Sequence, residues 1–238
     1  MSAPLAVVTG GSGGLGRACA GVLVARGYDV VLTARNAKAL EASAREIGAR
    51  WIVADCSLEQ DVTSLMDQAG MPAVLVHAAG ILEGTFVREQ PVSTWDHVLE
   101  VNLRSAYLVT RAALQGMEAG GRIIYISSTA GLKGMKGLSA YSASKAAIAA
   151  LAQSVAAEVE REGIAVHLVT PAPVRTAMID PDAKLKMWLL EPEDVASAVA
   201  WLVSLHPRVV VREVVLRSVA TGPFAPEPIG QKEQHNDG

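Results

Sequence analysis

The sequence predicts an α/β fold in which a doubly wound parallel sheet carries helices on both faces. Three observations predict it. Short β-branched and aliphatic runs alternate with longer segments of helical pattern, and a glycine-rich turn follows the first run directly. Half of the 238 residues are hydrophobic, which is enough for one large buried core. Apolar strands joined by helical crossovers form parallel sheets, because right-handed connections cover each face in turn.

Seven runs have the length and composition of buried strands. They span Leu5–Thr9, Val30–Thr33, Trp51–Ala54, Val74–His77, Arg122–Ser127, Ala165–Thr170 and Glu213–Leu216. We therefore expect a single Rossmann-type domain over residues 1–220, with a sheet of about seven strands. Residues 221–238 are dominated by proline, glycine and polar side chains, which predicts a mobile tail or an arm on a neighbouring subunit.

Composition argues against several classes of protein. The formal net charge is −3 and the basic residues are scattered, which is not typical of nucleic-acid binding. Cys19 and Cys56 lack CxxC or metal-ligand spacing, so we expect free thiols and no metal. No apolar stretch approaches the roughly 20 residues of a membrane helix. The first strand begins at Leu5, which leaves no room for a signal peptide, so we expect a soluble cytoplasmic protein.

The turn after the first strand has the composition of a phosphate-binding loop. It runs from Thr9 to Gly16 and opens a helix that extends towards Arg26. Glycines let the backbone approach a pyrophosphate closely, and the exposed N–H groups with the helix dipole favour its negative charge. A position between a strand and a helix makes a merely flexible loop the weaker interpretation.

Residues after the second and third strands indicate which dinucleotide would bind. An acid after the second strand usually binds the ribose 2′-OH of NAD, whereas an arginine there accommodates a 2′-phosphate. This chain has Arg35 and no acid, so we favour NADP(H), although Arg35 as an ordinary solvated residue is the alternative. Asp55 is placed either to accept a hydrogen bond from an adenine amino group or to cap the following helix.

Ser128, Tyr141 and Lys145 form a candidate proton-transfer centre. Tyr141 and Lys145 share a helix face at i and i+4, a spacing that by itself is common on helices. A neighbouring ammonium favours phenolate, so we expect the pKa of Tyr141 to move from about 10 towards neutrality. Ser128, at the end of the fifth strand, would hold and polarise a substrate carbonyl oxygen. This chemistry favours carbonyl reduction.

The chain resembles the short-chain dehydrogenase/reductase family over roughly residues 3–218. The motifs that carry the resemblance are the glycine loop with Thr9, Gly10, Gly14 and Gly16, then Asp55, Asn102, Ser128 and the Tyr141/Lys145 pair. The resemblance implies that Tyr141 is the acid/base, that Lys145 lowers its pKa and binds the nicotinamide ribose, and that Ser128 orients the substrate oxygen. Asn102 would hold a water that links Lys145 to solvent.

The resemblance also implies a set of residues that bind the cofactor. They are Gly10, Ser12, Gly13, Gly14, Leu15, Gly16, Arg35, Asp55, Cys56, Ala78, Ala79, Gly80, Tyr141, Lys145, Val174 and Thr176. Gly13 stands where many NADP-using members carry a second basic residue, so selectivity would rest largely on Arg35 and NAD(H) use stays an alternative.

Two further positions depart from the family pattern. His77 replaces the asparagine of the family's Asn-Ala-Ala-Gly, and we expect this histidine to have a structural role. Pro171-Ala172 replaces Pro-Gly, so the nicotinamide would be placed slightly differently.

The implied function is NADPH-dependent interconversion of a small carbonyl compound and its alcohol. Within the family, the chain resembles the subgroups of the 3-hydroxy acid/serine dehydrogenases or the 3-oxoacyl-carrier-protein reductases. Substrate contacts are expected from Ala130–Ser139 and Ala177–Leu190. Helices around Thr94–Met117 and Ser139–Arg161 would join subunits into a homodimer or homotetramer. The alternatives are an NADP(H)-binding sensor or scaffold without turnover, and a sugar-nucleotide epimerase or dehydratase, for which the chain stops too soon.

Overall fold

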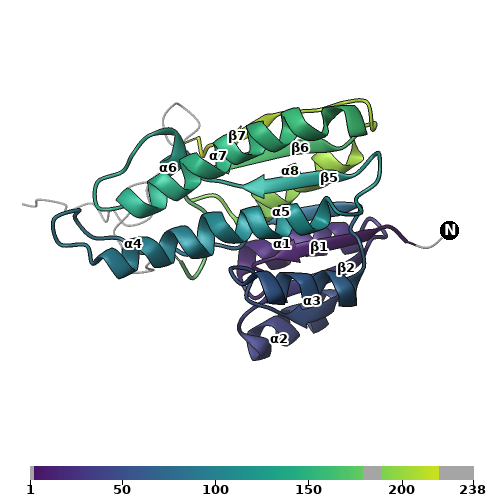
Figure 1. The fold of residues 1–238 in the computed structure, drawn as a ribbon, viewed down its shortest axis with the longest axis horizontal. Helices are drawn as coiled ribbons and strands as arrows, with labels where there is room; N and C mark the ends of the chain where they lie inside the picture. Colours follow the sequence, from purple (N-terminus) through teal and green to yellow (C-terminus); the bar gives the residue numbers. More distant parts are fainter. Residues whose placement is uncertain (1–2, 179–188, 220–238) are drawn as a thin grey trace, which may run out of the picture.

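The computed structural model describes residues 3–178 and 189–219, and one seven-stranded parallel sheet runs through them (Figure 1). The strands are β1 (Leu5–Thr9), β2 (Asp29–Ala34), β3 (Arg50–Val53), β4 (Val74–His77), β5 (Arg122–Ile126), β6 (Ala165–Pro171) and β7 (Glu213–Leu216). Their order in the sheet is β3-β2-β1-β4-β5-β6-β7. The predicted fold class is confirmed, and each predicted strand differs from the observed one by at most one residue at either end.

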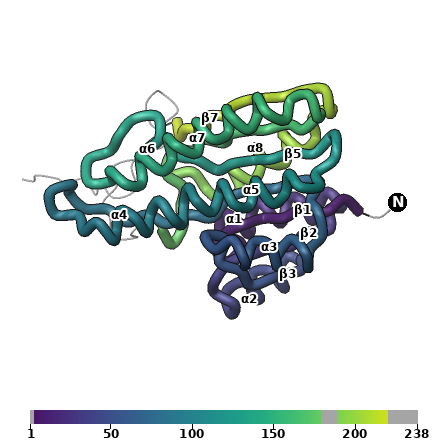
Figure 2. Tube along the Cα trace, viewed as in Figure 1, coloured from purple at the N-terminus to yellow at the C-terminus, as the bar shows by residue number. Residues whose placement is uncertain are grey.

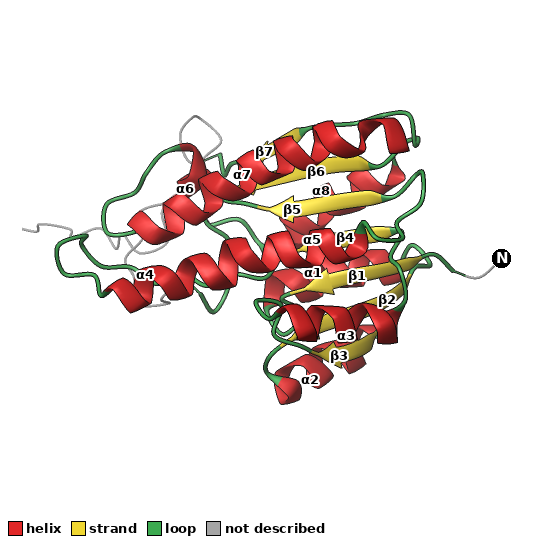
Figure 3. Cartoon of the chain, in the orientation of Figure 1, coloured by secondary structure: helices red, strands yellow, loops and turns green. Residues whose placement is uncertain are grey.

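Helices cover both faces of this sheet (Figure 3). They are α1 (Gly14–Val24), α2 (Ala37–Ile47), α3 (Glu59–Ala69), α4 (Val92–Leu99), α5 (Ser105–Ala113), α6 (Thr129–Leu132), α7 (Ser139–Val159) and α8 (Pro192–Ser204), with a π-helical turn η1 (Glu100–Arg104) and a 3₁₀ turn η2 (Glu160–Glu162). The face of the sheet covered by helices α3, α5 and α7 lies towards the viewer in Figure 1, and α1, α2 and α8 pack on the other face. None of the helices within the described ranges is long and apolar enough to cross a membrane.

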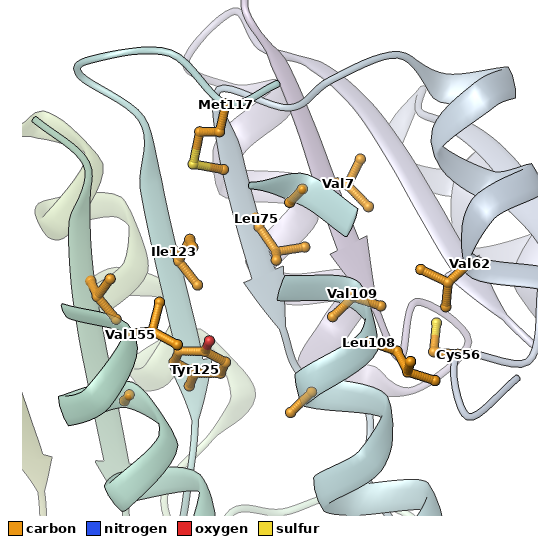
Figure 4. Close-up of a cluster of buried hydrophobic side chains, with 14 of the residues drawn as sticks. Val7, Cys56, Val62, Leu75, Leu108, Val109, Met117, Ile123, Tyr125 and Val155 are labelled. Carbon is orange, nitrogen blue, oxygen red and sulfur yellow. The ribbon is translucent and has the colours of Figure 1, made fainter. Parts of the chain in front are cut away.

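Successive strand residues point to opposite faces, and both faces are buried. Val7, Leu75 and Ile123 of three different strands pack towards Val109 of α5 and Val155 of α7 (Figure 4). Their neighbours in each strand, such as Val8, Val76 and Ile124, instead pack with α1 and α8. This double burial explains why the strands read as continuous apolar runs rather than alternating ones.

The topology brings distant residues to one edge of the sheet. The chain builds β1, β2 and β3 outwards, then returns to place β4 on the other side of β1, so the two parts of the chain meet at β1 and β4 (Figure 2). In the β1–β4 register Thr9 lies opposite His77, and both are the last residues of their strands. Ligands of such sheets bind beyond the carboxyl ends of the strands at this reversal point.

Gly16 in the first turn of α1 is required by close backbone packing. A Cβ on Gly16 would press on the carbonyl of Gly10, with its carbonyl carbon at 2.7 Å, whereas a Cβ on Gly14 would meet nothing within 4 Å. We therefore expect Gly16→Ala to lower the free energy of unfolding by about 1–3 kcal/mol, and Gly14→Ala to change it by less than about 1 kcal/mol. Urea unfolding followed by circular dichroism measures both; equal losses in the two variants would contradict this account.

Candidate active site

The end of β5 and the first turns of α7 bring Ser128, Tyr141 and Lys145 together, as predicted. The Ser127 hydroxyl donates to the carbonyl of Lys145 at 3.0 Å, which fastens the strand end to the helix. Ser128 caps the short helix α6, and its Oγ accepts a hydrogen bond from the N–H of Ala130 at 3.2 Å. The phenol of Tyr141 interacts with the Ser128 side chain, and Lys145 Nζ lies 5.8 Å from the centre of the Tyr141 ring.

The proton affinity of Tyr141 differs from the expectation. Burial raises the pKa of Tyr141 above its ordinary value of 10.0, and the hydrogen bond with Ser128 lowers it by a smaller amount. Lys145 Nζ donates instead to the carbonyl of Ile126 at 3.0 Å, and burial lowers the pKa of Lys145 to about 8. The expected shift of the Tyr141 pKa towards neutrality is therefore wrong, because desolvation of the buried phenol outweighs its hydrogen bond with Ser128.

Asn102 lies in the π-helical turn η1 and is fully buried. Its Oδ1 accepts the N–H of Ile81 at 2.8 Å, and its Nδ2 donates to the carbonyl of Ile81 at 3.0 Å and to Ser144 Oγ at 2.9 Å. Ser144 Oγ in turn donates to the carbonyl of Tyr141 at 2.7 Å. The Asn102 side chain therefore braces the loop after β4 against the helix of Tyr141, and its link to Lys145 through a water stays a prediction.

His77 connects β1, β4 and the start of α5, which agrees with the structural role expected for it. Ser105 Oγ donates to the carbonyl of Val101, so it is free to accept from His77 Nε2 at 3.4 Å. His77 Nδ1 then accepts from the hydroxyl of Thr9 at 3.0 Å. This chain of bonds requires a neutral ring. Burial, followed by the charge of Lys145, lowers the pKa of His77 to about 3.

An open cleft lies beyond the carboxyl ends of β1 to β4. Its lining includes the predicted Gly10, Ser12, Arg35, Asp55, Cys56, Ala79 and Gly80. It also includes residues that sequence reasoning missed, namely Thr33, Ala34, Ala54, Ser57, Ile81, Val101 and Ser105. The β-strand pattern of Thr33 and the helical pattern of Ser105 gave no signal that either faces a cleft.

The cleft has features that suit a dinucleotide. Gly10 has φ of 72°, and a Cβ there would lie 2.8 Å from the carbonyl carbon of Ala78, so the loop can adopt its course only with glycine. The N-cap of α1 is Gly13, which supplies no side-chain cap, and no acidic residue occupies the first turn. These free helical N–H groups fit a pyrophosphate. Thr33 also belongs to the cleft lining, and within the described residues its buried hydroxyl has no hydrogen-bond partner.

Arg35 and Asp55 face each other at the end of the cleft beyond β2 and β3. Arg35 Nη1 lies 3.8 Å from Asp55 Oδ2. Asp55 Oδ1 accepts both the N–H of Ser57 at 3.0 Å and its hydroxyl at 2.7 Å. These bonds stabilise the turn before α3 but do not cap that helix, because its N-cap is Leu58 and receives no side-chain cap. The other oxygen remains beside Arg35.

Several predicted residues contact the site less directly. Val174 forms an isolated β-bridge with Leu190, which anchors the segment after β6. Thr85 forms a bridge with Leu138, which joins the loop after β4 to the segment predicted to contact substrate. Most of the second substrate segment, residues 179–188, and the predicted tail, residues 221–238, lie outside the described residues. Over the described part of the chain, no three His, Cys, Asp or Glu side chains are grouped as metal ligands.

Comparisons with known proteins agree with this geometry. A family model described as short chain dehydrogenase matches residues 4–185. An uncharacterized oxidoreductase of Staphylococcus aureus is 30% identical over 90% of this chain and 97% of its own length. A short chain dehydrogenase from Burkholderia cenocepacia, solved in complex with NADP, has a TM-score of 0.85 and 29% identity over 92% of this chain and 98% of that chain. A blue fluorescent protein from a metagenomic library, solved with NADPH, has a TM-score of 0.80 and 29% identity over 89% of this chain and 96% of that chain.

His77 should make the folded protein sensitive to acid. The folded-state pKa of His77, about 3, lies below its ordinary value of 6.5. Between these two pH values the imidazole is protonated in the unfolded chain and neutral in the folded protein. Stability contributed by neutral His77 is complete above pH 6.5 and is lost as the pH falls towards 3, with a slope of at most about 1.4 kcal/mol per pH unit. Burial also lowers the pKa of His167, so His77→Asn should flatten this slope without abolishing it.

The measurement is the free energy of unfolding by urea at several pH values between 7 and 4.5. The exposed His206 supplies the matched control, His206→Asn. An equal flattening in both variants, or none in His77→Asn, would contradict the assignment.

Proposed function

Because the chain belongs to the short-chain dehydrogenase/reductase family, we propose that it is an NADPH-dependent oxidoreductase that interconverts a small carbonyl compound and its alcohol. The observation that carries the proposal is the convergence of Ser128, Tyr141 and Lys145 at the end of β5, beside a cleft suited to a dinucleotide. When bound, the nicotinamide supplies or accepts the hydride. All other chemistry then falls to side chains of the protein.

Tyr141 is the proposed general acid for carbonyl reduction. Its raised pKa keeps the phenol protonated at neutral pH, which is the state needed to donate a proton to a developing alkoxide. The Ser128 hydroxyl would hold the same substrate oxygen and stabilise its growing negative charge. A protonated Tyr141 therefore favours reduction over oxidation at neutral pH.

Lys145 is the proposed source of the replacement proton. The pKa of Lys145, lowered to about 8 by burial, allows its ammonium to give up a proton near neutrality. A Cβ placed on Gly80 would lie 3.4 Å from Lys145 Nζ and 3.3 Å from Asn102 Oδ1, so all three groups meet at one point. This proximity supports a role for Asn102 in keeping Lys145 in position and in hydration of the ammonium.

The preference for NADPH is proposed from two independent observations. Arg35 lines the adenosine end of the cleft, and no acid takes the position after β2 that would bind a ribose 2′-OH. Two solved relatives with 29% identity are described with NADP or NADPH bound. Arg35 would bind the 2′-phosphate, and the free N–H groups of α1 would bind the pyrophosphate.

Tyr141→Phe tests the reaction. We expect it to lower turnover about 10²–10⁴-fold, the usual contribution of a general acid, while NADPH binding followed by cofactor fluorescence changes little. Turnover is measured as NADPH and NADH consumption with a panel of small ketones, aldehydes and 3-oxoacyl thioesters. Tyr107→Phe, at an exposed tyrosine of α5, is the matched control and should retain full activity. A Tyr141→Phe rate equal to wild type would refute the mechanism.

We also propose that the chain forms a homodimer or homotetramer through α4, α5 and α7. A groove over these helices is lined by Asp96, Leu99, Glu100, Leu103, Arg104, Tyr107 and Leu151. Apolar side chains with both signs of charge suit a self-complementary contact between two copies. Light scattering of purified protein should give a mass of two or four chains, and Tyr107→Glu should lower it. A monomer of wild-type protein at micromolar concentration would refute this interface.

A further inference from the structure

We propose that Asp55 is a specificity-determining residue that limits how strongly the adenosine end of the cleft prefers a 2′-phosphate to a 2′-hydroxyl. The proposal rests on the proposed function, because it requires that this cleft binds a nicotinamide dinucleotide. Arg35 attracts the phosphate, and the Asp55 carboxylate opposes it. The preference for NADPH is then the balance of these two charges rather than the effect of Arg35 alone.

The Asp55 carboxylate is held in a fixed orientation. Its Oδ1 accepts two hydrogen bonds from Ser57, one from the backbone at 3.0 Å and one from the hydroxyl at 2.7 Å. The N–H of Asp55 donates to Asp61 Oδ2 at 2.9 Å, which fixes the backbone of the same residue. Rotation of the carboxylate would break both bonds to Ser57. Its second oxygen therefore stays on the side of Arg35.

The distance between Arg35 and Asp55 decides which of two effects prevails. A carboxylate that orients a guanidinium does so through hydrogen bonds of about 2.7–2.9 Å. Arg35 Nη1 lies 3.8 Å from Asp55 Oδ2, and their side chains are 50% and 28% exposed. At this separation Asp55 does not fix the orientation of the Arg35 guanidinium. It still interacts electrostatically with any anion that Arg35 would bind.

Two carboxylates and one guanidinium act on Cys56 at this end of the cleft. Asp55 and Asp61 contribute two negative charges and Arg35 one positive charge, and all three act on the Cys56 thiol. Burial is the largest cause of the raised pKa of Cys56, and the two carboxylates raise this pKa further. Arg17, the basic residue of α1, is paired with Glu46 at 2.7 Å. A 2′-phosphate therefore meets partial repulsion, whereas a neutral 2′-hydroxyl does not.

The test compares equilibrium binding of NADPH and NADH, each followed by its own fluorescence, in wild-type protein and in Asp55→Asn. Asparagine keeps the shape and the acceptor oxygen for Ser57 while removing the charge. We expect the ratio of the NADH to the NADPH dissociation constant to rise about three- to tenfold. Any contact between residue 55 and the adenine ring is common to both cofactors and cancels in the ratio. The rise should shrink at high salt.

Asp29→Asn is the matched control, because Asp29 pairs with Arg50 at 2.8 Å at the opposite end of β2. It should leave the ratio unchanged. Asp55→Ser is the second variant should Asp55→Asn fail to fold by circular dichroism, and it should change the ratio in the same direction. A ratio that stays constant or falls on loss of the Asp55 charge overturns the proposal. A fall would mean that Asp55 orients the Arg35 guanidinium for the phosphate.

The wild-type measurement separates this proposal from the proposed function. Wild-type protein that prefers NADPH, with no change in Asp55→Asn, refutes only the role of Asp55. Wild-type protein that binds neither cofactor refutes the proposed function and the Asp55 proposal with it. Wild-type protein that prefers NADH refutes only the proposed NADPH dependence, and the change of the ratio in Asp55→Asn still decides the role of Asp55.

Discussion

Polar groups buried at the carboxyl ends of β1, β4 and β5 must each find a hydrogen-bond partner, and the arrangement of the site follows from this requirement. Thr9, His77 and Ser105 satisfy one another in a directed chain that ends on the carbonyl of Val101. Asn102 satisfies both backbone groups of Ile81 and reaches Ser144. The two networks meet in the π-helical turn η1 and at the start of α5, so the strands, this turn and α7 are fixed relative to one another.

The same burial determines the proton states of the site. Desolvation disfavours every charged form, so it raises the pKa of Tyr141 and lowers those of Lys145 and His77. Neutral His77 adds no second positive charge beside Lys145. The result is a protonated phenol beside an ammonium that releases its proton near neutrality, an arrangement suited to proton delivery rather than proton removal.

The two ends of the cleft treat negative charge differently. At the glycine loop, free N–H groups and the dipole of α1 present positive character with no carboxylate in the first turn. At the adenosine end, Arg35 stands opposite a carboxylate fixed by Ser57. In the proposed cofactor complex, recognition of the pyrophosphate would depend on backbone geometry, which few substitutions can alter. Discrimination at the ribose would depend on a few surface charges, which substitutions can readily alter.

Local features of the sequence determined the strands, the phosphate loop and the shared helix face of Tyr141 and Lys145, because periodicity, turn chemistry and i,i+4 spacing act between near neighbours. Only the tertiary structure decided the partners of His77, since Thr9 lies 68 residues away along the chain and Ser105 28 residues away. It also reversed the expected shift of the Tyr141 pKa and divided the two oxygens of Asp55 between Ser57 and Arg35. Desolvation and long-range Coulomb interaction depend on every group packed around a side chain, and no spacing in the sequence encodes that environment.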